Sequence, residues 1–400
     1  MRVLILEPHA SGHHASYLRW LVQAANQRRW KVAIASTRAA LSHPTLRTLA
    51  GELDDVHFHL MTDVSVDDGR PVRSYRLMRR EFAYWRSFNR AAAEVRKQEP
   101  IDAVILPYVD YCFYALALLG SPFYKLPWCA ISMRLAAPPD TAVEDSSLTW
   151  KWRFARRLLG EPHLQALFSI NPSVREVPPS WGSAAQLSKL RYLPDPAEYE
   201  IAGVRKELRE ALGVAEGQIA ILVFGSIDER KGIDSLLDSL VAQEGLENYV
   251  VILAGRQSGN FRNGLRVDRW TQMVSSKRLI VMDRFLTNEE QNRLFTAVDI
   301  VWLGYRNHPY MSGVLVLAGK AGIPVLGTTE GEIGGLIAKY GLGVSARIDR
   351  PAEVASALHA MHDVRSRAEM GQRARSAFAG HTAESFGSGV MAAFHSLESP

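Results

Sequence analysis

The chain has 400 residues, 47% of them hydrophobic and 22% charged, with a formal net charge of +5 at pH 7. This length predicts two domains of ordinary size, and this composition excludes a disordered or fibrous protein. The two cysteines, Cys112 and Cys129, are too few for a disulfide framework and lack the spacing of a zinc site, which favours a reducing compartment.

No targeting or membrane-spanning segment is predicted. The apolar run Val3–Leu6 is too short for the core of a signal peptide, and no apolar run of about 18 residues is present to cross a bilayer. We therefore expect a cytoplasmic protein.

Short runs rich in Val, Ile and Leu alternate with longer helical patterns along the whole chain, which is typical of parallel βαβ units. In the first half we expect strands at Val3–Leu6, Lys31–Ala35, Val56–Leu60, Ala103–Leu106, Cys129–Ser132 and Leu167–Ile170. In the second half we expect them at Ile219–Phe224, Tyr249–Ala254, Leu279–Met282, Ile300–Leu303, Pro324–Leu326 and Gly343–Ala346. The pattern predicts an α/β protein in which each half is doubly wound.

Polar residues follow the first expected strand in the loop Glu7–His14. Open parallel sheets bind ligands beyond the carboxyl ends of their strands. His13 and His14 are therefore candidates for acid–base chemistry or for hydrogen bonds to a substrate hydroxyl or phosphate. A histidine pair with a structural role is the alternative, and no third ligand that would make a metal site is evident.

Basic and aromatic residues are interleaved at helical spacing in two segments, Arg70–Lys97 and Trp150–Arg157. The first segment contains nine Lys or Arg residues against two acidic residues. Such helices suit an anionic membrane surface or an acidic substrate, and an ordinary solvated helix face is the alternative. Because no nucleic-acid recognition motif lies nearby, no nucleic-acid partner is expected.

Asp110 comes just past the expected strand Ala103–Leu106. An ionised aspartate there can accept the proton of an acceptor hydroxyl or stabilise an oxocarbenium-like centre. Alternatively, it caps a helix expected over Tyr111–Leu119.

Two prolines in the segment Leu193–Pro196 resist both a helix and a central strand, which indicates a crossover between domains. We place a first domain at residues 1–195 and a second at 196–380. The chain after Pro351 is expected to be helical to about Ala379. A last helix within 381–400 is expected to fold back on the first domain.

The strand Ile219–Phe224 leads into a turn that contains Gly225, Arg230 and Lys231, before a helix expected over Ser235–Ala242. Gly225 permits close backbone approach, and the two basic residues supply positive charge where a diphosphate can lie. A solvated turn is the alternative.

A second ligand-binding pattern follows the strand Ile300–Leu303. Ser312 is expected to cap a short apolar helix over Val314–Ala321, and Gly313 leaves the N–H groups of its first turn open to an anion. An ordinary capped core helix is the alternative.

Together these segments resemble the donor-binding domain of retaining GT-B glycosyltransferases similar to family four. The resemblance covers roughly residues 190–350 and rests on the order and spacing of Leu222–Ile227, Arg230–Asp234, Val251–Gly255, Asp283–Leu286, Ala297–Ile300 and Ala321–Leu326. It implies the GT-B fold, in which two Rossmann-like doubly wound domains face an interdomain cleft.

The resemblance also implies a donor site. Lys231 corresponds to the family's lysine that contacts the donor diphosphate. Ser226 stands where the family has a basic residue, so Arg230 or Arg256 is expected to substitute. The expected donor-binding residues are Gly225, Ser226, Arg230, Lys231, Arg256, Phe285, Leu286, Ser312, Gly313 and Val314.

The family commonly carries two glutamates separated by seven residues, and here those places are taken by Pro309 and Leu317. Contacts to the ribose and the donor sugar are therefore expected to differ from the family's, whereas phosphate contacts are retained. Glu330 and Glu332 form another acidic pair, which either faces the cleft or belongs to a turn.

The loop Glu7–His14 resembles the family's N-terminal glycine-containing loop near the acceptor. We therefore expect Gly12, His13 and Arg134 to bind the acceptor, and His14 and Asp110 to be catalytic. Arg134 lies in the stretch where the family often has a catalytic-site histidine, and it is expected to neutralise an anion instead.

These inferences predict a metal-independent retaining glycosyltransferase that needs no cofactor besides its nucleotide-sugar substrate. The expected acceptor is a saccharide or a lipid-linked cell-envelope or polysaccharide precursor, reached from the cytoplasm and peripherally at the inner face of an anionic membrane. A GT-B-fold subunit that binds or scaffolds without catalysis is the alternative, and a sugar-nucleotide epimerase is a third hypothesis.

Overall fold

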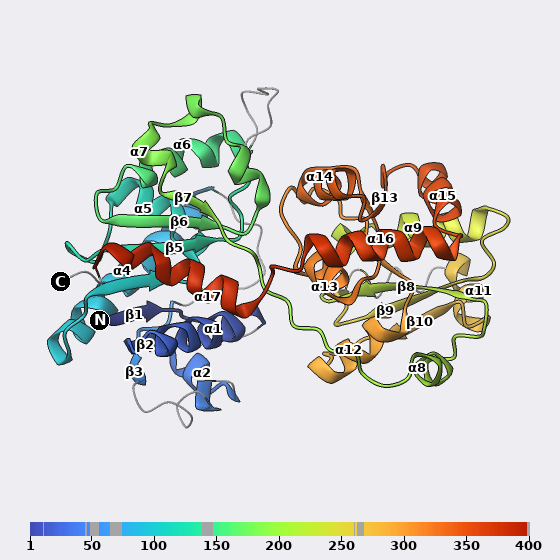
Figure 1. The fold of residues 1–400 in the computed structure, drawn as a ribbon, viewed down its shortest axis with the longest axis horizontal. Coiled ribbons are helices and arrows are strands. Elements are labelled where there is room, and N and C mark those ends of the chain that lie inside the picture. Colours follow the sequence, from blue (N-terminus) through green and yellow to red (C-terminus); the bar gives the residue numbers. More distant parts are fainter. Residues whose placement is uncertain are drawn as a thin grey trace. The chain divides into compact units, whose positions relative to one another are not determined.

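A computed structural model describes residues 1–10, 12–44, 46–48, 56–64, 74–137, 147–259, 261 and 268–397. The chain forms two compact units (Figure 1). The first combines Met1–Pro194 with Ala383–Pro400, and the second is Asp195–Thr382. The first crossing between the units thus lies one residue from the expected boundary, and the second lies two residues from it.

The N-terminal unit is built on a seven-stranded parallel sheet with the order β3-β2-β1-β4-β5-β6-β7. The strands are β1 Arg2–Leu6, β2 Lys31–Ser36, β3 Val56–Leu60, β4 Ala103–Leu106, β5 Trp128–Ser132, β6 Leu164–Ser169 and β7 Leu190–Tyr192. The helices are α1 His13–Gln27, α2 Arg38–Leu41, α4 Ser74–Gln98, α5 Phe113–Leu119, α6 Ser147–Leu159, α7 Ala184–Leu187 and α17 Ala383–Met391, with 3-10 turns at Val109–Tyr111, Pro172–Glu176, Pro179–Trp181 and Ala392–Leu397.

The C-terminal unit is built on a six-stranded parallel sheet with the order β10-β9-β8-β11-β12-β13. Its strands are β8 Ile219–Phe224, β9 Tyr249–Ala254, β10 Leu279–Met282, β11 Ile300–Leu303, β12 Val325–Thr328 and β13 Gly343–Ala346. Its helices are α8 Arg205–Leu212, α9 Ile233–Ala242, α11 Asp268–Ser275, α12 Asn288–Ala297, α13 Gly313–Ala321, α14 Gly331–Tyr340, α15 Pro351–Ala360 and α16 Val364–Ala377, with a 3-10 turn at Glu229–Lys231.

Both sheets reverse their strand order next to their first strand, between β1 and β4 in one unit and between β8 and β11 in the other. The loops that leave two such strands diverge to opposite sides, which opens a crevice at the carboxyl edge of the sheet. Each unit therefore has one position where its topology favours ligand binding.

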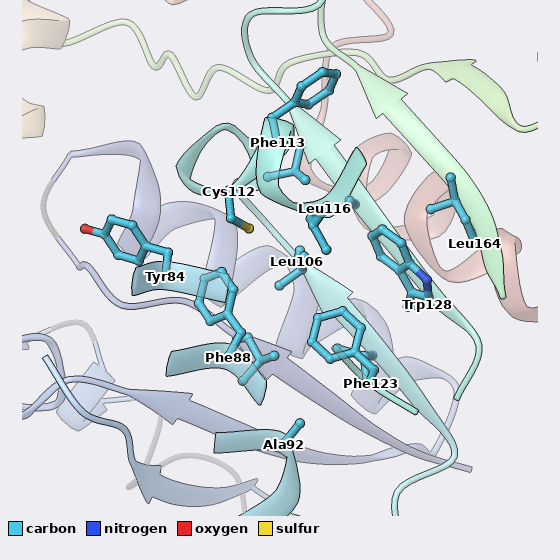
Figure 2. Close-up of a cluster of buried hydrophobic side chains, with 14 of the residues drawn as sticks. Tyr84, Phe88, Ala92, Leu106, Cys112, Phe113, Leu116, Phe123, Trp128 and Leu164 are labelled. Carbon is cyan, nitrogen blue, oxygen red and sulfur yellow. The ribbon is translucent and has the colours of Figure 1, made fainter. Parts of the chain in front are cut away.

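Apolar side chains of α4, α5 and α6 pack on one face of the N-terminal sheet. Figure 2 shows Tyr84, Phe88 and Ala92 of α4 pointing at the same layer as Leu106 and Trp128 of the strands. Burial of each large side chain contributes about 1.5–3 kcal/mol. This packing fixes α4, which contributes Tyr84 to the candidate site.

All twelve expected strands are present, but the sequence interpretation missed β7. This strand has only three residues, with Arg191 between Leu190 and Tyr192, so its pattern is too short to be recognised. Strand β6 also begins earlier than expected, at Leu164, because Gln165 interrupts the apolar run there.

The expected long helix after Pro351 is two helices. Helix α15 ends at Ala360, and the side chain of Asp363 accepts a hydrogen bond from the backbone N–H of Ser366 to begin α16. Farther on, α17 packs against α1, with the rings of Phe386 and Tyr17 centred 4.6 Å apart. A Cβ atom at Gly387 would lie 2.5 Å from that of Ala24, so a glycine permits this close approach.

The two segments that connect the units meet within the C-terminal unit. His381 and Asp195, which lie beside the two crossings, are joined by a 2.8 Å contact between the His381 Nδ1 atom and the Asp195 carbonyl oxygen. Among the helices of the described ranges, none is long and apolar enough to cross a bilayer.

Adjacent glycines in α14 provide a test of this packing. A Cβ atom at Gly334 would lie 2.2 Å from the carbonyl carbon of Thr329, whereas one at Gly335 would meet no atom within 4 Å. We expect Gly334→Ala to lower the free energy of unfolding by roughly 1–3 kcal/mol. Gly335→Ala should raise it by about 0.5–1 kcal/mol, because alanine restricts the unfolded chain and favours the helix. Urea unfolding followed by circular dichroism measures both, and the reverse order would contradict the placement of α14.

Candidate functional site

Two glycine turns lie against each other at the carboxyl ends of β8 and β9. Gly225 has a φ of 91° and Gly255 a φ of 143°, backbone angles that residues other than glycine rarely adopt. A Cβ atom at Gly255 would lie 1.9 Å from the Gly225 carbonyl oxygen. The close approach of the two turns therefore depends on glycine at position 255.

Lys231 lies at the end of the turn after β8 and is only 4% exposed. Its Nζ atom donates hydrogen bonds to the carbonyl oxygen of Phe224 (2.7 Å) and to the hydroxyl of Tyr305 (2.9 Å). It also lies 4.6 Å from the centre of the Tyr305 ring. An ammonium group has three N–H donors, so these two hydrogen bonds leave one donor for an anion.

Tyr305, which the sequence interpretation did not select, follows β11 and is 6% exposed. Burial raises the pKa of its phenol, but the charge and hydrogen bond of Lys231 oppose it, and the net pKa lies below the ordinary value. The Tyr305 hydroxyl also lies 3.4 Å from the hydroxyl of Ser312. Lys231, Tyr305 and Ser312, which we call the lysine–tyrosine–serine chain, thus connect the two turns singled out in the sequence.

Helix α13 begins at Gly313, with Ser312 as its N-cap residue. The expectation that the Ser312 side chain caps this helix is wrong: no such hydrogen bond is formed, and the hydroxyl lies beside Tyr305 instead. The first turn contains no acidic residue. Its N–H groups at Gly313 and Val314 therefore remain available to an anion at the positive end of the helix dipole.

The other expected donor-site residues lie on the same edge of the C-terminal sheet. Ser226 and Arg230 follow β8, Arg256 follows β9, and Phe285 and Leu286 follow β10. All except the half-buried Leu286 are exposed, and Phe285 is 78% exposed. The structure gives these five no hydrogen bond to the lysine–tyrosine–serine chain.

Arg306, which the sequence interpretation also passed over, has a structural role. Its guanidinium donates hydrogen bonds to both carboxylate oxygens of Asp234 and to the hydroxyl of Ser235. Its backbone N–H donates to the carbonyl of Arg230. These bonds tie the segment after β11 to the turn after β8 and so support the lysine–tyrosine–serine chain.

The two residues that stand where the family has glutamates, Pro309 and Leu317, make packing contacts in the structure. Leu317 is buried in α13. Pro309 packs against Gly331, and its carbonyl accepts a hydrogen bond from the backbone N–H of Glu332. Glu332 is buried at the start of α14, whereas Glu330, the N-cap residue, is exposed.

A histidine and tyrosine cluster occupies the topological crevice of the N-terminal unit, beside the ends of β1 and β4. The Glu7 carboxylate is inaccessible, and one of its oxygens lies 3.1 Å from Nδ1 of His14. The other oxygen accepts a hydrogen bond from the backbone N–H of His9. Nε2 of His14 lies 3.1 Å from the Tyr111 hydroxyl, and Nε2 of His9 lies 3.1 Å from that of Tyr84.

Burial dominates the ionisation of this cluster. It lowers the pKa of His9 and raises the pKa values of Tyr84 and Tyr111, so these side chains are held in their neutral forms near neutral pH. Tyr111 therefore remains a hydroxyl donor for His14. The sequence interpretation selected His14 but missed its partners, because their contacts span up to 97 positions in the chain.

Asp110 lies in the same unit and is fully engaged. Its carboxylate accepts hydrogen bonds from the Ser132 hydroxyl (2.9 Å), the Met133 backbone N–H (2.7 Å) and the ammonium of Lys151 (2.6 Å). Its side chain is 5% exposed. The alternative that Asp110 caps the following helix is wrong, since Glu81 accepts the hydrogen bonds from the first turn of α5.

The expected acceptor residues lie near this cluster in the fold. Gly12 precedes α1 with a φ of 59°, and it provides no side-chain cap to that helix. His13 is exposed and its ring packs edge-on to Tyr17. Arg134 is exposed after β5, close enough to Tyr108 to oppose the rise that burial causes in the pKa of that phenol.

Within the described residues, no group of three or more His, Cys, Asp or Glu side chains is arranged to hold a metal ion.

No protein-family model and no curated protein sequence matches the chain. Solved structures match it along nearly its whole length. HepE of Anabaena in complex with UDP is 16% identical, with a TM-score of 0.69 and coverage of 99% of this chain and 100% of that one. Sucrose-phosphate synthase of Thermosynechococcus elongatus is 12% identical, with a TM-score of 0.68 and coverage of 99% of both chains.

WaaG, a glycosyltransferase involved in lipopolysaccharide biosynthesis, is 16% identical, with a TM-score of 0.61 and coverage of 98% of this chain and 99% of that one. These neighbours are GT-B glycosyltransferases. The expected α/β fold with two Rossmann-like doubly wound domains is therefore confirmed as that of the GT-B class.

The carboxyl group of Glu81 allows a test of the buried network around α5. Burial raises its pKa to about 7, although hydrogen bonds from Ala115 and Tyr114 and the charge of Lys151 oppose the rise. The folded protein therefore holds this proton at pH values where the unfolded chain, with a pKa of 4.5, has released it. The stability contributed by Glu81 is complete below the unfolded pKa and is lost as pH rises through the folded one.

We expect Glu81→Gln, which keeps an acceptor but does not titrate, to gain stability relative to the wild type as pH rises through this window. Urea unfolding at pH values on either side of the window measures the difference. Glu94→Gln, at an exposed position of the same helix, is the control and should show no comparable trend. A constant difference for Glu81→Gln would disprove the raised pKa.

Proposed function

We propose that this protein is a glycosyltransferase that moves a sugar from a nucleoside-diphosphate donor to an acceptor. The observation that carries the proposal is the lysine–tyrosine–serine chain at the carboxyl edge of the C-terminal sheet. It brings a buried ammonium to the uncapped start of α13, where positive charge and N–H donors suit a diphosphate. Structures of similar fold have UDP or UDP-glucose bound, which is consistent with such a donor.

In this proposal the diphosphate is the leaving group, and its developing charge is stabilised by fixed protein groups. Lys231 donates its third N–H, and the N–H groups of Gly313 and Val314 point along the helix dipole toward the phosphate. Ser226 and the guanidinium groups of Arg230 and Arg256 supply further donors from exposed positions. These charges make a metal-independent reaction the expected one.

The remaining donor contacts are assigned to the loops after β8 and β10. Gly225 allows the donor to approach the backbone, and the exposed ring of Phe285, with Leu286, offers an apolar surface for the nucleobase. Because Pro309 and Leu317 provide no carboxylate, the ribose and the sugar must be recognised by other groups.

For the acceptor, we propose His14 as the catalytic residue of the N-terminal unit. Nδ1 of its ring lies 3.1 Å from the Glu7 carboxylate and Nε2 lies 3.1 Å from the Tyr111 hydroxyl, a setting in which an imidazole can take up or release a proton. Gly12, His13 and Arg134 are proposed to bind the acceptor. Asp110 is the weaker catalytic candidate, because its carboxylate is already occupied by three donors.

We propose retention of anomeric configuration from the resemblance to retaining family four, and NMR of the first product anomer tests it. The proposed acceptor is a cell-envelope or polysaccharide precursor at the cytoplasmic face of the membrane. Exposed aromatic rings beneath arginines support an anionic surface as partner: Arg86 lies over Phe82 and Arg153 over Trp150. Residues 65–73, which include Arg70 and Arg73 of the basic segment, lie outside the described residues.

The donor site is tested by Lys231→Ala. Loss of one charge-assisted hydrogen bond weakens binding by about 1.5–3 kcal/mol, so we expect the Kd for UDP to rise roughly ten- to a hundred-fold. Isothermal titration calorimetry with UDP, GDP and ADP identifies the base and measures the change.

Lys206→Ala, at an exposed position of α8 in the same unit, is the matched control and should bind as the wild type does. Failure of every nucleotide to bind the wild type would overturn the transferase proposal. Binding without sugar transfer to any acceptor would favour the alternative of a scaffold subunit, and interconversion of the donor sugar would favour an epimerase.

The catalytic assignment is tested with neighbouring histidines. We expect His14→Gln to lower kcat by about 10²–10⁴-fold, the range for loss of a general acid–base group, with the Kd for UDP unchanged. His13→Ala is expected to raise KM for the acceptor more than it lowers kcat. His163→Ala is the control in the same unit. A normal kcat for His14→Gln would remove His14 from the mechanism.

A further inference from the structure

A pocket of about 600 Å³ lies on the N-terminal unit. It shares no lining residue with the histidine and tyrosine cluster. Two elements form it: α6 and the 3-10 turn Pro179–Trp181. Its lining residues are Trp152, Arg153, Arg156, Ser180 and Trp181. None of them is among the residues proposed to bind the donor or the acceptor, and only Arg153 also belongs to the surface proposed to face an anionic membrane.

The aromatic part of this tryptophan–arginine pocket is fixed by packing. Trp152 is fully buried, and its indole N–H donates a 2.5 Å hydrogen bond to the carbonyl of Ala136. The ring of Trp181 stands edge-on to it, with the ring centres 6.1 Å apart and the planes at 63°. Trp181 is partly exposed, so a rigid indole surface remains open to a ligand.

The segment that carries Trp181 is also held in place. Ser183 and Gln186 form a reciprocal capping box at the start of α7. The Gln186 side-chain oxygen accepts a hydrogen bond in this box, and its amide nitrogen donates one of 2.9 Å to the carbonyl oxygen of Arg156. The turn is thus attached to α6, and both sides of the pocket are in position before any ligand arrives.

The charged residues among the described lining of the pocket are both arginines. Arg153 and Arg156 are exposed and lie three residues apart on α6, a spacing that places both on one face of the helix. The Arg153 guanidinium is 4.8 Å from the centre of the Trp150 ring, which restricts it while its N–H donors stay available. Within the part of the chain that the structure describes, no carboxylate lines the pocket and neither guanidinium is ion-paired.

We propose that this pocket binds an anionic saccharide, with a sugar ring against Trp181 and a phosphate or carboxylate held by Arg153 and Arg156. The volume is within the range of small-ligand sites. Arginine pairs suit planar, bidentate recognition of such anions. The hydroxyl of Ser180 adds a donor and an acceptor for sugar hydroxyls. The proposal does not depend on transferase activity, because it concerns binding alone.

The test uses glucose 6-phosphate as the probe, with glucose as its neutral counterpart. Saturation-transfer NMR and calorimetric titration are run on the full chain in the presence of saturating UDP, so that the diphosphate site is occupied. We expect glucose 6-phosphate to bind at least ten-fold more tightly than glucose, because the arginines recognise its charge.

The double variant Arg153→Gln/Arg156→Gln removes two charge-assisted hydrogen bonds, so we expect it to weaken glucose 6-phosphate binding by about ten-fold or more. Trp181→Ala should weaken glucose and glucose 6-phosphate alike. The control Arg76→Gln/Arg79→Gln has the same spacing and charge change on exposed positions of α4 and should bind normally. Far-UV circular dichroism verifies that each variant is folded.

Four results would overturn the proposal. One is equal binding of glucose and glucose 6-phosphate, and another is equal loss of binding in the two double variants. The third comes from vesicles: if phosphatidylglycerol vesicles bind through Arg153 and Arg156 while glucose 6-phosphate does not bind, the anion is a lipid headgroup. Loss of glucose 6-phosphate binding in Lys231→Ala, without UDP present, would instead assign the probe to the donor site.

Discussion

The arrangement of the C-terminal unit depends on the buried ammonium group of Lys231. A charge with so little exposure is costly unless its hydrogen bonds are satisfied, and here they come from the Phe224 carbonyl and the Tyr305 hydroxyl. The first partner ends β8 and the second follows β11, the two strands that flank the reversal of strand order. Satisfying this one charge therefore fixes both sides of the crevice.

The same buried group explains the glycines around it. Gly232 follows Lys231 with a φ of 58°, and a Cβ atom there would lie 2.4 Å from the carbonyl oxygen of Gly304. The indole N–H of Trp302 donates to the Lys231 carbonyl, 2.7 Å away. Backbone and side chain of Lys231 are thus both held against β11, and only small residues fit between them.

The corresponding crevice of the N-terminal unit is lined by buried carboxylates. Two carboxylates are buried there, Glu7 beside His14, and Asp110 paired with the similarly buried ammonium of Lys151. Buried carboxylates orient histidines and backbone donors, which suits proton transfer from a hydroxyl, whereas a buried ammonium suits an anionic leaving group. The proposed division of acceptor and donor binding between the units follows from this difference in charge.

The alternation of strands and helices could be predicted from the sequence, because buried parallel strands require continuous apolar runs that are visible locally. The sequence also indicated the positions of Gly225, Lys231 and Gly313, since turns after strands need glycine and the resemblance to a glycosyltransferase family points to the lysine. Strand β7 was not predicted, because three residues are too few to show the hydrophobic periodicity of a strand.

Which side chains contact one another depends on the tertiary structure. Tyr305 lies 74 positions from Lys231, and Tyr111 lies 97 positions from His14, so no local pattern marks either pair. The tertiary structure also places the Ser312 hydroxyl beside Tyr305 rather than in a helix cap. It surrounds the Asp110 carboxylate with three hydrogen-bond donors. Such contacts arise from strand order and side-chain packing, which bring distant residues together after each element has formed.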